Sequence, residues 1–212
     1  MTEQDAVTER AVVPERAVVP ERDTAPERPV VPERVVVLVG APASGKTTLR
    51  DALVARSPLA VLSPDDERAA MRARALASGR EPRALQDYSL PAIRRCEEAA
   101  ARLLAEGRGY LADATHLRRR ERVAHVRAAH AAGLPAVAVL LPDLPLEVLT
   151  ARNDRRAEHR CVPEDALARH AHRRGLLTAA LLREEGFDDV MELDGVDDVE
   201  QLTTETVLQP VR

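Results

Sequence analysis

The fold of this chain is decided by the stretch Val35-Val36-Val37-Leu38-Val39-Gly40-Ala41-Pro42-Ala43-Ser44-Gly45-Lys46-Thr47-Thr48. Its first five residues are an unbroken run of valine and leucine, which predicts a strand buried on both faces. The part from Gly40 to Thr47 fits the pattern G-x-x-x-x-G-K-[ST]. It lies between that strand and a helix predicted over residues 46–56, which is the context that the motif requires. The stretch therefore predicts a loop that holds the phosphates of a nucleotide.

Each position of this loop has a physical reason. Glycines let the backbone curl so that successive N–H groups point at phosphate oxygens, and the start of the following helix adds a partial positive charge. The ammonium of Lys46 can reach the β- and γ-phosphates, and the hydroxyl of Thr47 can bind Mg²⁺. We therefore expect ATP and Mg²⁺ as cofactors. The predicted nucleotide-binding residues are Gly40, Ala43, Ser44, Gly45, Lys46, Thr47 and Thr48.

The charged residues single out the same loop. The 212-residue chain has 31 basic and 35 acidic residues, a formal net charge of −4, and Lys46 is its one lysine. A compact ammonium fits a phosphate cradle where a wide guanidinium does not. The middle of the chain is basic: residues 35–183 carry 25 basic and 17 acidic groups, or +8, whereas residues 184–212 carry 1 and 10, or −9. This basic middle suits a phosphate-rich ligand.

The rest of the chain alternates strands and helices. Further strands are predicted over residues 59–62, 110–112, 136–141 and about 190–193, and further helices over 66–78, 84–106, 119–132, from 146 to 152, and 164–185. Such alternation indicates a parallel sheet with right-handed crossovers. The predicted fold class is α/β, a P-loop NTPase-type parallel sheet flanked by helices. Only three residues are Tyr or Phe and none is Trp, so the core is expected to be aliphatic.

The first 34 residues differ from this pattern. Glu-Arg recurs there every six residues, and Pro14, Pro20, Pro26 and Pro32 share that period. A period of six fits neither a helix nor a strand, and the prolines bar helix interiors. We expect a disordered tail over residues 1–34, with an unknown partner if any, and a kinase-type domain over residues 35–212.

Several classes of protein are not favoured. The longest apolar runs are far shorter than the roughly 20 residues that span a bilayer, so no membrane association is expected. Cys96 and Cys161 lie in no CxxC or Cys/His ligand spacing, and too few cysteines are present for a disulfide framework. His170 and His172 are two apart and would not share a helix face. A reducing, cytoplasmic setting is expected.

A second functional block follows the second predicted strand. The residues Ser63-Pro64-Asp65-Asp66-Glu67-Arg68 lie at the carboxyl edge of that strand, which lines the ligand crevice of an open α/β sheet. A carboxylate near a γ-phosphate can accept the proton of an attacking hydroxyl, and an arginine three residues later can hold a substrate phosphate. The same residues suit a helix start with Ser63 or Asp65 as the N-cap. Both interpretations stay open, for different residues.

Two later segments carry further candidates. Asp113 ends the third predicted strand, where it could position Mg²⁺ through water or merely bond a loop. The segment from Arg152 to Arg160 holds four arginines in nine residues. Arg152 and Arg156 would share a face if this segment is helical. Such residues are typical of a mobile lid that neutralises charge on a transferring phosphoryl group, here over about residues 152–163. An exposed basic helix is the alternative.

These blocks resemble the 5′-hydroxyl polynucleotide kinases, the kinase module of phage-type and bacterial end-healing enzymes. The resemblance covers about residues 35–172 and also includes Gly109-Tyr110-Leu111-Ala112-Asp113-Ala114-Thr115 and Val162-Pro163. It implies an ATP-dependent kinase that acts on a nucleic-acid 5′-end. The roles that it implies are a general base at Asp65, a clamp on the substrate phosphate at Arg68, and contacts to ATP from Arg152 and Arg156. With Lys46, the residues Asp65, Arg68 and Arg156 are the predicted catalytic set, and Asp113 joins Thr47 as a candidate Mg²⁺ ligand.

Two other functions remain open. The same phosphate loop, strand-end acid and arginine lid occur in kinases of small molecules, including antibiotic phosphotransferases, and in zeta-type toxins that phosphorylate nucleotide sugars. In those cases the acceptor is a small-molecule hydroxyl. The third possibility is a non-enzymatic ATP-binding adaptor whose repeat tail docks a partner.

Overall fold

The computed structural model describes residues 34–56, 59–81, 83–157 and 160–194. All of them belong to one unit of the chain, residues 31–212. The predicted tail lies outside the described residues except for Arg34, and so does the end of the chain from residue 195. Within the described part, no helix is long and apolar enough to cross a membrane.

A five-stranded parallel sheet forms the centre of this unit, in the order β2-β3-β1-β4-β5. The strand β1 pairs with β3 on one side and β4 on the other, with Val35 opposite both Tyr110 and Ala136. The predicted parallel sheet is confirmed. The strands are β1 (Val35–Val39), β2 (Val61–Leu62), β3 (Tyr110–Ala112), β4 (Ala136–Leu140) and β5 (Asp189–Glu192).

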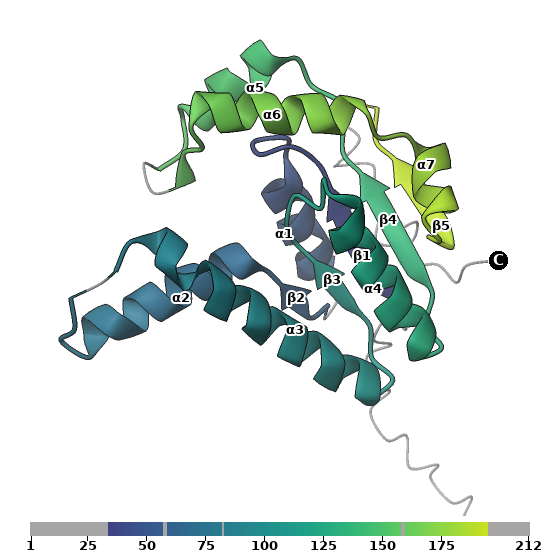
Figure 1. The fold of residues 1–212 in the computed structure, drawn as a ribbon, viewed down its shortest axis with the longest axis horizontal. Helices are drawn as coiled ribbons and strands as arrows, with labels where there is room; N and C mark the ends of the chain where they lie inside the picture. The colour runs from purple at the N-terminus through teal and green to yellow at the C-terminus, as the bar shows by residue number, and fades with distance from the viewer. Residues whose placement is uncertain (1–33, 57–58, 82, 158–159, 195–212) are drawn as a thin grey trace, which may run out of the picture. The chain divides into compact units, whose positions relative to one another are not determined.

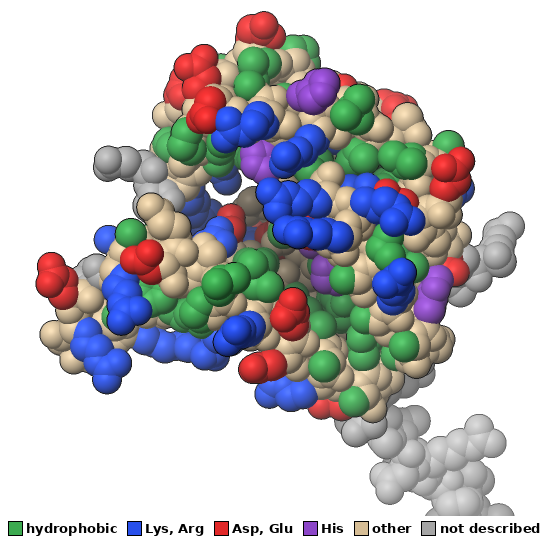
Figure 2. Space-filling model, viewed as in Figure 1, with side chains coloured by type: hydrophobic (Ala, Val, Ile, Leu, Met, Phe, Trp, Pro, Cys, Tyr) green, Lys and Arg blue, Asp and Glu red, His purple; other side chains and the backbone are tan. Residues whose placement is uncertain are grey.

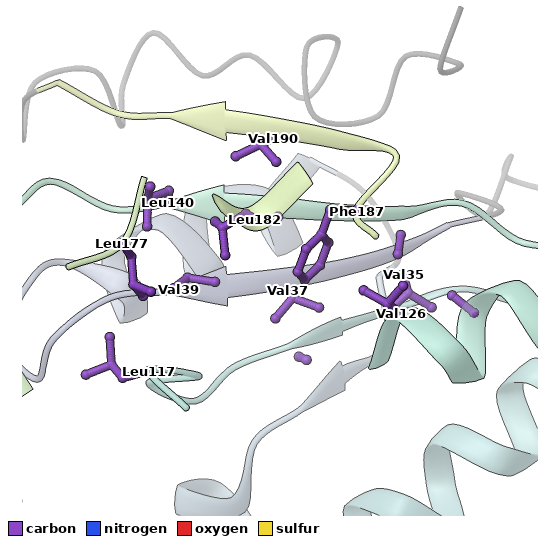
Figure 3. Close-up of a cluster of buried hydrophobic side chains, with 14 of the residues drawn as sticks. Val35, Val37, Val39, Leu117, Val126, Leu140, Leu177, Leu182, Phe187 and Val190 are labelled. Carbon is purple, nitrogen blue, oxygen red and sulfur yellow. The ribbon is translucent and has the colours of Figure 1, made fainter. Parts of the chain in front are cut away.

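Helices cover both faces of the sheet (Figure 1). Val36 and Leu38 of β1 pack with Leu49 and Leu53 of α1 on one face. The alternate residues of β1 point to the other face, where they pack with Val126 of α4 and with Leu182 and Phe187 (Figure 3). All five β1 residues are buried as a result. The helices are α1 (Lys46–Arg56), α2 (Pro64–Ala77), α3 (Ser89–Ala105), α4 (Arg119–Ala131), α5 (Leu146–Asn153), α6 (Glu164–Gly175) and α7 (Ala179–Glu184).

The structure corrects the helix predicted over residues 164–185, which is two helices. Helix α6 ends at Gly175, and the Thr178 hydroxyl accepts a hydrogen bond from the Leu181 N–H at 3.2 Å, so that Thr178 caps α7. A threonine at this place offers the backbone an alternative to the helical ladder. The buried Arg174 guanidinium donates to the Leu177 carbonyl at 3.0 Å and so helps to fix the break.

Other boundaries shift by shorter lengths. The helix predicted from residue 84 begins as a separate 3-10 helix, Leu85–Tyr88, before α3. The strand predicted over residues 59–62 contains only Val61 and Leu62. Helix α2 starts at Pro64, two residues earlier than predicted. Proline is tolerated at the first helical position because the N–H that it lacks would have no partner within the helix.

A buried ion pair ties α4 to the chain after α7. The Arg122 guanidinium donates to both carboxylate oxygens of Glu185, at 2.6 and 2.5 Å, and to the His116 carbonyl at 2.8 Å. Both charged side chains are only 2% exposed. A bidentate pair of this kind is stable when all its polar atoms are satisfied, and removal of one partner leaves a buried charge.

We therefore expect Arg122→Met to lower the free energy of unfolding by about 3–5 kcal/mol, as measured by urea denaturation. The double variant Arg122→Met/Glu185→Leu should lose less, because no unpaired charge remains. The matched control is Glu121→Ala, which removes an exposed pair with Arg118 and should cost about 0.5 kcal/mol or less. Equal losses in the single and double variants would contradict this account.

Candidate active site

The loop between β1 and α1 has the backbone geometry of a phosphate cradle. Ala43 and Gly45 adopt left-handed conformations, with φ of 63° and 106°, and such residues turn neighbouring N–H groups toward one concave side. Gly40 has to be glycine, since a Cβ there would lie 2.8 Å from Ser44 Oγ and 2.9 Å from Leu141 Cβ. The Oγ of Ser44 is buried and has no hydrogen-bond partner among the described residues. The backbone N–H groups of the loop, rather than the buried Ser44 hydroxyl, are therefore the donors that a phosphate could reach.

Lys46 lies inside the cradle. Its ammonium donates to the carbonyls of Gly40 and Ala41, at 3.0 and 2.6 Å. Burial lowers the pKa of Lys46 to about 8, while the nearby charge of Asp113 raises it, Arg156 lowers it and Asp65 raises it. The electrostatic environment of the lysine therefore includes the strand-end acid, the lid and the start of α2.

The start of α2 shows which residue caps the helix. The Ser63 hydroxyl accepts the Asp66 N–H at 3.4 Å, which makes Ser63 the N-cap. Asp65 is not used as the cap, because its side chain is 73% exposed and pairs with Arg68 three residues on. The capping interpretation of this block therefore holds for Ser63, and the carboxylate of Asp65 remains available for chemistry.

Sequence reasoning missed Arg50. Its Nη1 donates to Asp66 Oδ2 at 2.8 Å and to Asp113 Oδ2 at 3.0 Å, so one guanidinium joins α1, α2 and the end of β3. Burial raises the pKa of Asp113, and the charges of Arg50 and Lys46 oppose that rise. A signal was available, since Arg50 lies four residues after Lys46 and therefore on the same helix face.

The segment after β3 is fastened to the phosphate loop. The Gly40 N–H donates to the Thr115 carbonyl at 3.1 Å, and the His116 Nδ1–H donates to the Leu38 carbonyl at 2.8 Å. His116 holds a left-handed backbone with φ of 45°, a conformation that is uncommon outside glycine and asparagine. No sequence pattern indicates the role of this histidine, because it depends on a contact with a strand 78 residues earlier.

His116 of this segment contacts a second histidine, His125 of α4. The rings of His116 and His125 meet edge to face with centroids 5.0 Å apart, and the Tyr110 hydroxyl is hydrogen-bonded to His125 Nδ1 at 2.9 Å. Burial lowers the pKa of His116 to about 3, with a smaller effect from His125. Burial also lowers the pKa of His125 to about 4.

The arginine-rich lid is a loop with fastened ends. Helix α5 ends at Asn153, so Arg152 lies on the helix and Arg156 lies in the turn beyond it, which excludes the shared helix face considered for them. The Asn153 side chain donates to the Val162 carbonyl and accepts the Val162 N–H, both at 3.0 Å. Asn153 thereby closes a loop that contains most of the predicted lid.

These parts surround one cleft of about 1470 Å³, which Figure 2 shows as a hollow beside α2 and α3. Gly40 and Ser44 are not at its surface; they shape the loop from behind. All other predicted site residues line the cleft, together with Arg50 and His116. These predicted residues are Ala43, Gly45, Lys46, Thr47, Thr48, Asp65, Arg68, Asp113, Arg152 and Arg156.

The donor set suits a nucleotide with its Mg²⁺ better than a resident metal. Within the described residues, no group of three or more His, Cys, Asp or Glu side chains could hold a metal ion, and both cysteines are free. Thr47 and Asp113 both line the cleft. A magnesium ion that arrives with phosphates needs only one or two such ligands from the protein.

Residues 35–177, more than half of the chain, match the model of a family described as an AAA domain. The chain belongs to this family. No curated protein matches it. The match spans the phosphate loop, the carboxylates and the lid, so the P-loop fold predicted from the sequence is confirmed.

Solved structures with the same fold include kinases. The chain is 19% identical to an unliganded sugar kinase from Janibacter sp. HTCC2649, over 84% of this chain and 96% of that one, with a TM-score of 0.56. It is 20% identical to a candidate kinase from Chloroflexus aurantiacus J-10-fl, over 85% and 94%, with a TM-score of 0.53. It is 23% identical to a chain of the Pnkp1/Rnl/Hen1 RNA repair complex, over 69% of this chain and 45% of that one, with a TM-score of 0.54. At these identities the likeness shows a kinase-like P-loop fold.

The two histidines make stability depend on pH. Their pKa values of about 3 and about 4 in the fold compare with an ordinary value of 6.5, so below pH 6.5 the unfolded chain takes up protons that the fold excludes. Stability is therefore lost as pH falls from 6.5. Between roughly pH 6 and 4, we expect each histidine to lower the free energy of unfolding by about 1.4 kcal/mol per pH unit. Urea denaturation at a series of pH values measures this slope.

The matched variant is His116→Asn, since asparagine tolerates the left-handed backbone at this position. It should lose the contribution of one histidine to the slope of stability against pH and keep that of His125. A slope equal to that of the unaltered protein would contradict the assignment of His116 as a buried neutral group.

Proposed function

We propose that the protein is an ATP-dependent kinase that transfers the γ-phosphate to the 5′-hydroxyl end of a polynucleotide, in the cytoplasm. The observation that carries the proposal is the cleft, in which Asp65 and Arg68 of α2 meet Lys46 and the lid arginines. Phosphoryl transfer needs a base that accepts the proton of the acceptor hydroxyl, and cations that bind the phosphates of the acceptor and of the donor.

The donor side is assigned to the loop. Backbone N–H groups of Gly45, Lys46 and Thr47 and the ammonium of Lys46 hold the phosphates of ATP, and Arg152 and Arg156 cover them from the lid. Thr47 would hold Mg²⁺, with Asp113 as a ligand through water. Bound there, the ion supplies charge neutralisation on the phosphates.

The acceptor side is assigned to the start of α2. The carboxylate of Asp65 accepts the proton of the acceptor hydroxyl as its oxygen bonds to the γ-phosphorus, and the bond from that phosphorus to the β,γ-bridging oxygen breaks to release ADP. Arg68 forms an ion pair with Asp65, which places its guanidinium beside the proposed base. Its guanidinium then binds the acceptor's phosphate, which suits a planar fork of donors.

A small-molecule hydroxyl is the second candidate acceptor, as in antibiotic-type or nucleotide-sugar kinases. The observation that favours it is the scarcity of stacking surfaces: of the residue types Phe, Tyr and Trp, only Tyr110 lines the cleft among the described residues, and its hydroxyl is held by His125. Proteins that bind single strands without sequence preference commonly stack bases on aromatic rings. A non-enzymatic adaptor has no such supporting observation.

We expect Asp65→Asn to keep ATP binding and to lose phosphoryl transfer by about 10²-fold or more, the usual scale for loss of a general base. The measurement is kcat with a labelled γ-phosphate, beside a calorimetric Kd for ATP. Asp66→Asn is the matched control, since Asp66 pairs with Arg50 instead. Loss of transfer in Asp66→Asn with an active Asp65→Asn would move the base to Asp66.

A panel of acceptors tests the substrate. Oligonucleotides of RNA and of DNA with 5′-hydroxyl ends are incubated with labelled ATP, next to sugars, nucleosides and nucleotide sugars. We expect label on the oligonucleotides and none on the same strands with a 5′-phosphate. Label on small molecules only would establish the second candidate, and no transfer to any acceptor would favour the adaptor.

A further inference from the structure

Basic side chains gather where the start of α4 meets the end of α6. Arg118, Arg119 and Arg120 are consecutive at the start of α4, and Arg173 lies in the last turn of α6. We call these four residues the arginine patch; all of them line a second hollow of about 640 Å³. Figure 2 shows a group of blue side chains between α6 and α4 on this face.

The charge of the arginine patch is poorly compensated within the described residues. Arg120 and Arg173 form no ion pair there. Arg118 and Arg119 approach carboxylates only at 4.0 Å, on Glu121 and Glu185, and Glu185 is already held by Arg122. The N-terminus of α4 adds its own partial positive charge. The patch is therefore suited to an anionic partner.

The patch adjoins the cleft along two segments of the chain. Arg173 lies three residues after His170 on α6, and Leu117 to Arg120 lie between His116 and Glu121, which both line the cleft. His170 lines the cleft, and its buried Nδ1 has no partner among the described residues. Burial lowers the pKa of His170, and the charges of Arg173, Lys46, Arg118 and Arg169 lower it further. The groups that act on His170 thus include Lys46 of the phosphate loop and two members of the patch.

We propose that a single-stranded nucleic acid with its 5′-end at Asp65 leaves the cleft past His170 and places its following phosphates on the arginine patch. This inference rests on the proposed polynucleotide acceptor. Guanidinium groups pair with phosphate oxygens through two parallel hydrogen bonds, so the four arginines of the patch can hold successive phosphates of the strand.

The floor of the second hollow suits a nucleic acid better than a free phosphate. Leucines line it beside the arginines, and Leu176 is 62% exposed. An apolar floor can receive the face of a base or ribose while the rim holds the backbone. A polynucleotide brings both parts, and its chain necessarily continues beyond the terminal residue bound in the cleft.

The test compares two acceptors with labelled ATP. One is a nucleoside 3′-monophosphate, which ends at the first phosphate, and the other is a 5′-hydroxyl oligonucleotide of about eight nucleotides. For the unaltered protein we expect a KM at least about tenfold lower for the oligonucleotide, and a KM that rises with salt as released counterions are replaced.

The variant Arg120→Ala/Arg173→Ala removes two arginines that form no ion pair among the described residues. Its KM for the oligonucleotide should rise about tenfold, and the salt slope of log KM should fall by about 0.7 for each phosphate that the variant no longer neutralises. Its kcat, its KM for ATP and its KM for the nucleoside 3′-monophosphate should not change. Arg102→Ala/Arg127→Ala, on α3 and α4 outside the patch, is the matched control and should change none of these values.

The outcomes separate the two proposals. Equal KM values for both acceptors, or an unchanged oligonucleotide KM in the variant, would overturn the arginine patch as the path of the strand and leave the kinase assignment intact. Competition by polyglutamate as strong as that by a 5′-phosphorylated oligonucleotide would overturn it in favour of an acidic protein partner. No transfer to either acceptor would overturn the polynucleotide function and this inference with it.

Discussion

Strand β1 consists of apolar side chains that point to both faces of the sheet, and the rest of the structure depends on covering both. Helix α1 covers Val36 and Leu38 on one face. On the other face, α4, α7 and Phe187 cover the alternate valines of β1. A strand with helices on both faces and parallel neighbours on both sides must be central. Its carboxyl end therefore meets the end of β3, which is how the burial of five residues brings the phosphate loop beside Asp113.

Arginine serves two purposes in this fold. In the interior, Arg122 and Arg174 donate hydrogen bonds to the carbonyls of His116 and Leu141 at 2.8 and 2.7 Å, and Arg122 also pairs with the buried Glu185. Around the cleft, Arg50 and Arg68 pair with carboxylates, whereas Arg152 and Arg156 line the open space of the cleft. The number of arginines in the sequence does not distinguish these two uses, because a buried guanidinium and an exposed one are the same letter in the sequence.

The sequence was sufficient for the parallel sheet and for the phosphate-loop, strand-end and arginine side of the cleft, but not for the side that α3 and α4 form. Physical reasons explain the difference. Strand β1, the phosphate loop and the pair Asp65–Arg68 depend on local patterns, so they could be predicted. The break at Leu176–Thr178 could not, because a threonine cap and a buried arginine compete with helical periodicity only after tertiary contacts form. Arg50 and His116 depend on partners far along the chain, and only Arg50 left a spacing signal.

The clamp between Asn153 and Val162 has a consequence for the changes that this chain can tolerate. Because one side chain pairs with both polar backbone groups of Val162, the ends of the intervening loop are fixed independently of what lies between them. Residues can be inserted, deleted or exchanged in that loop without displacing α5 or α6, since the cost of lengthening a closed loop is small. The number and reach of the arginines in that loop can then change in this chain while the sheet and the phosphate loop stay as they are.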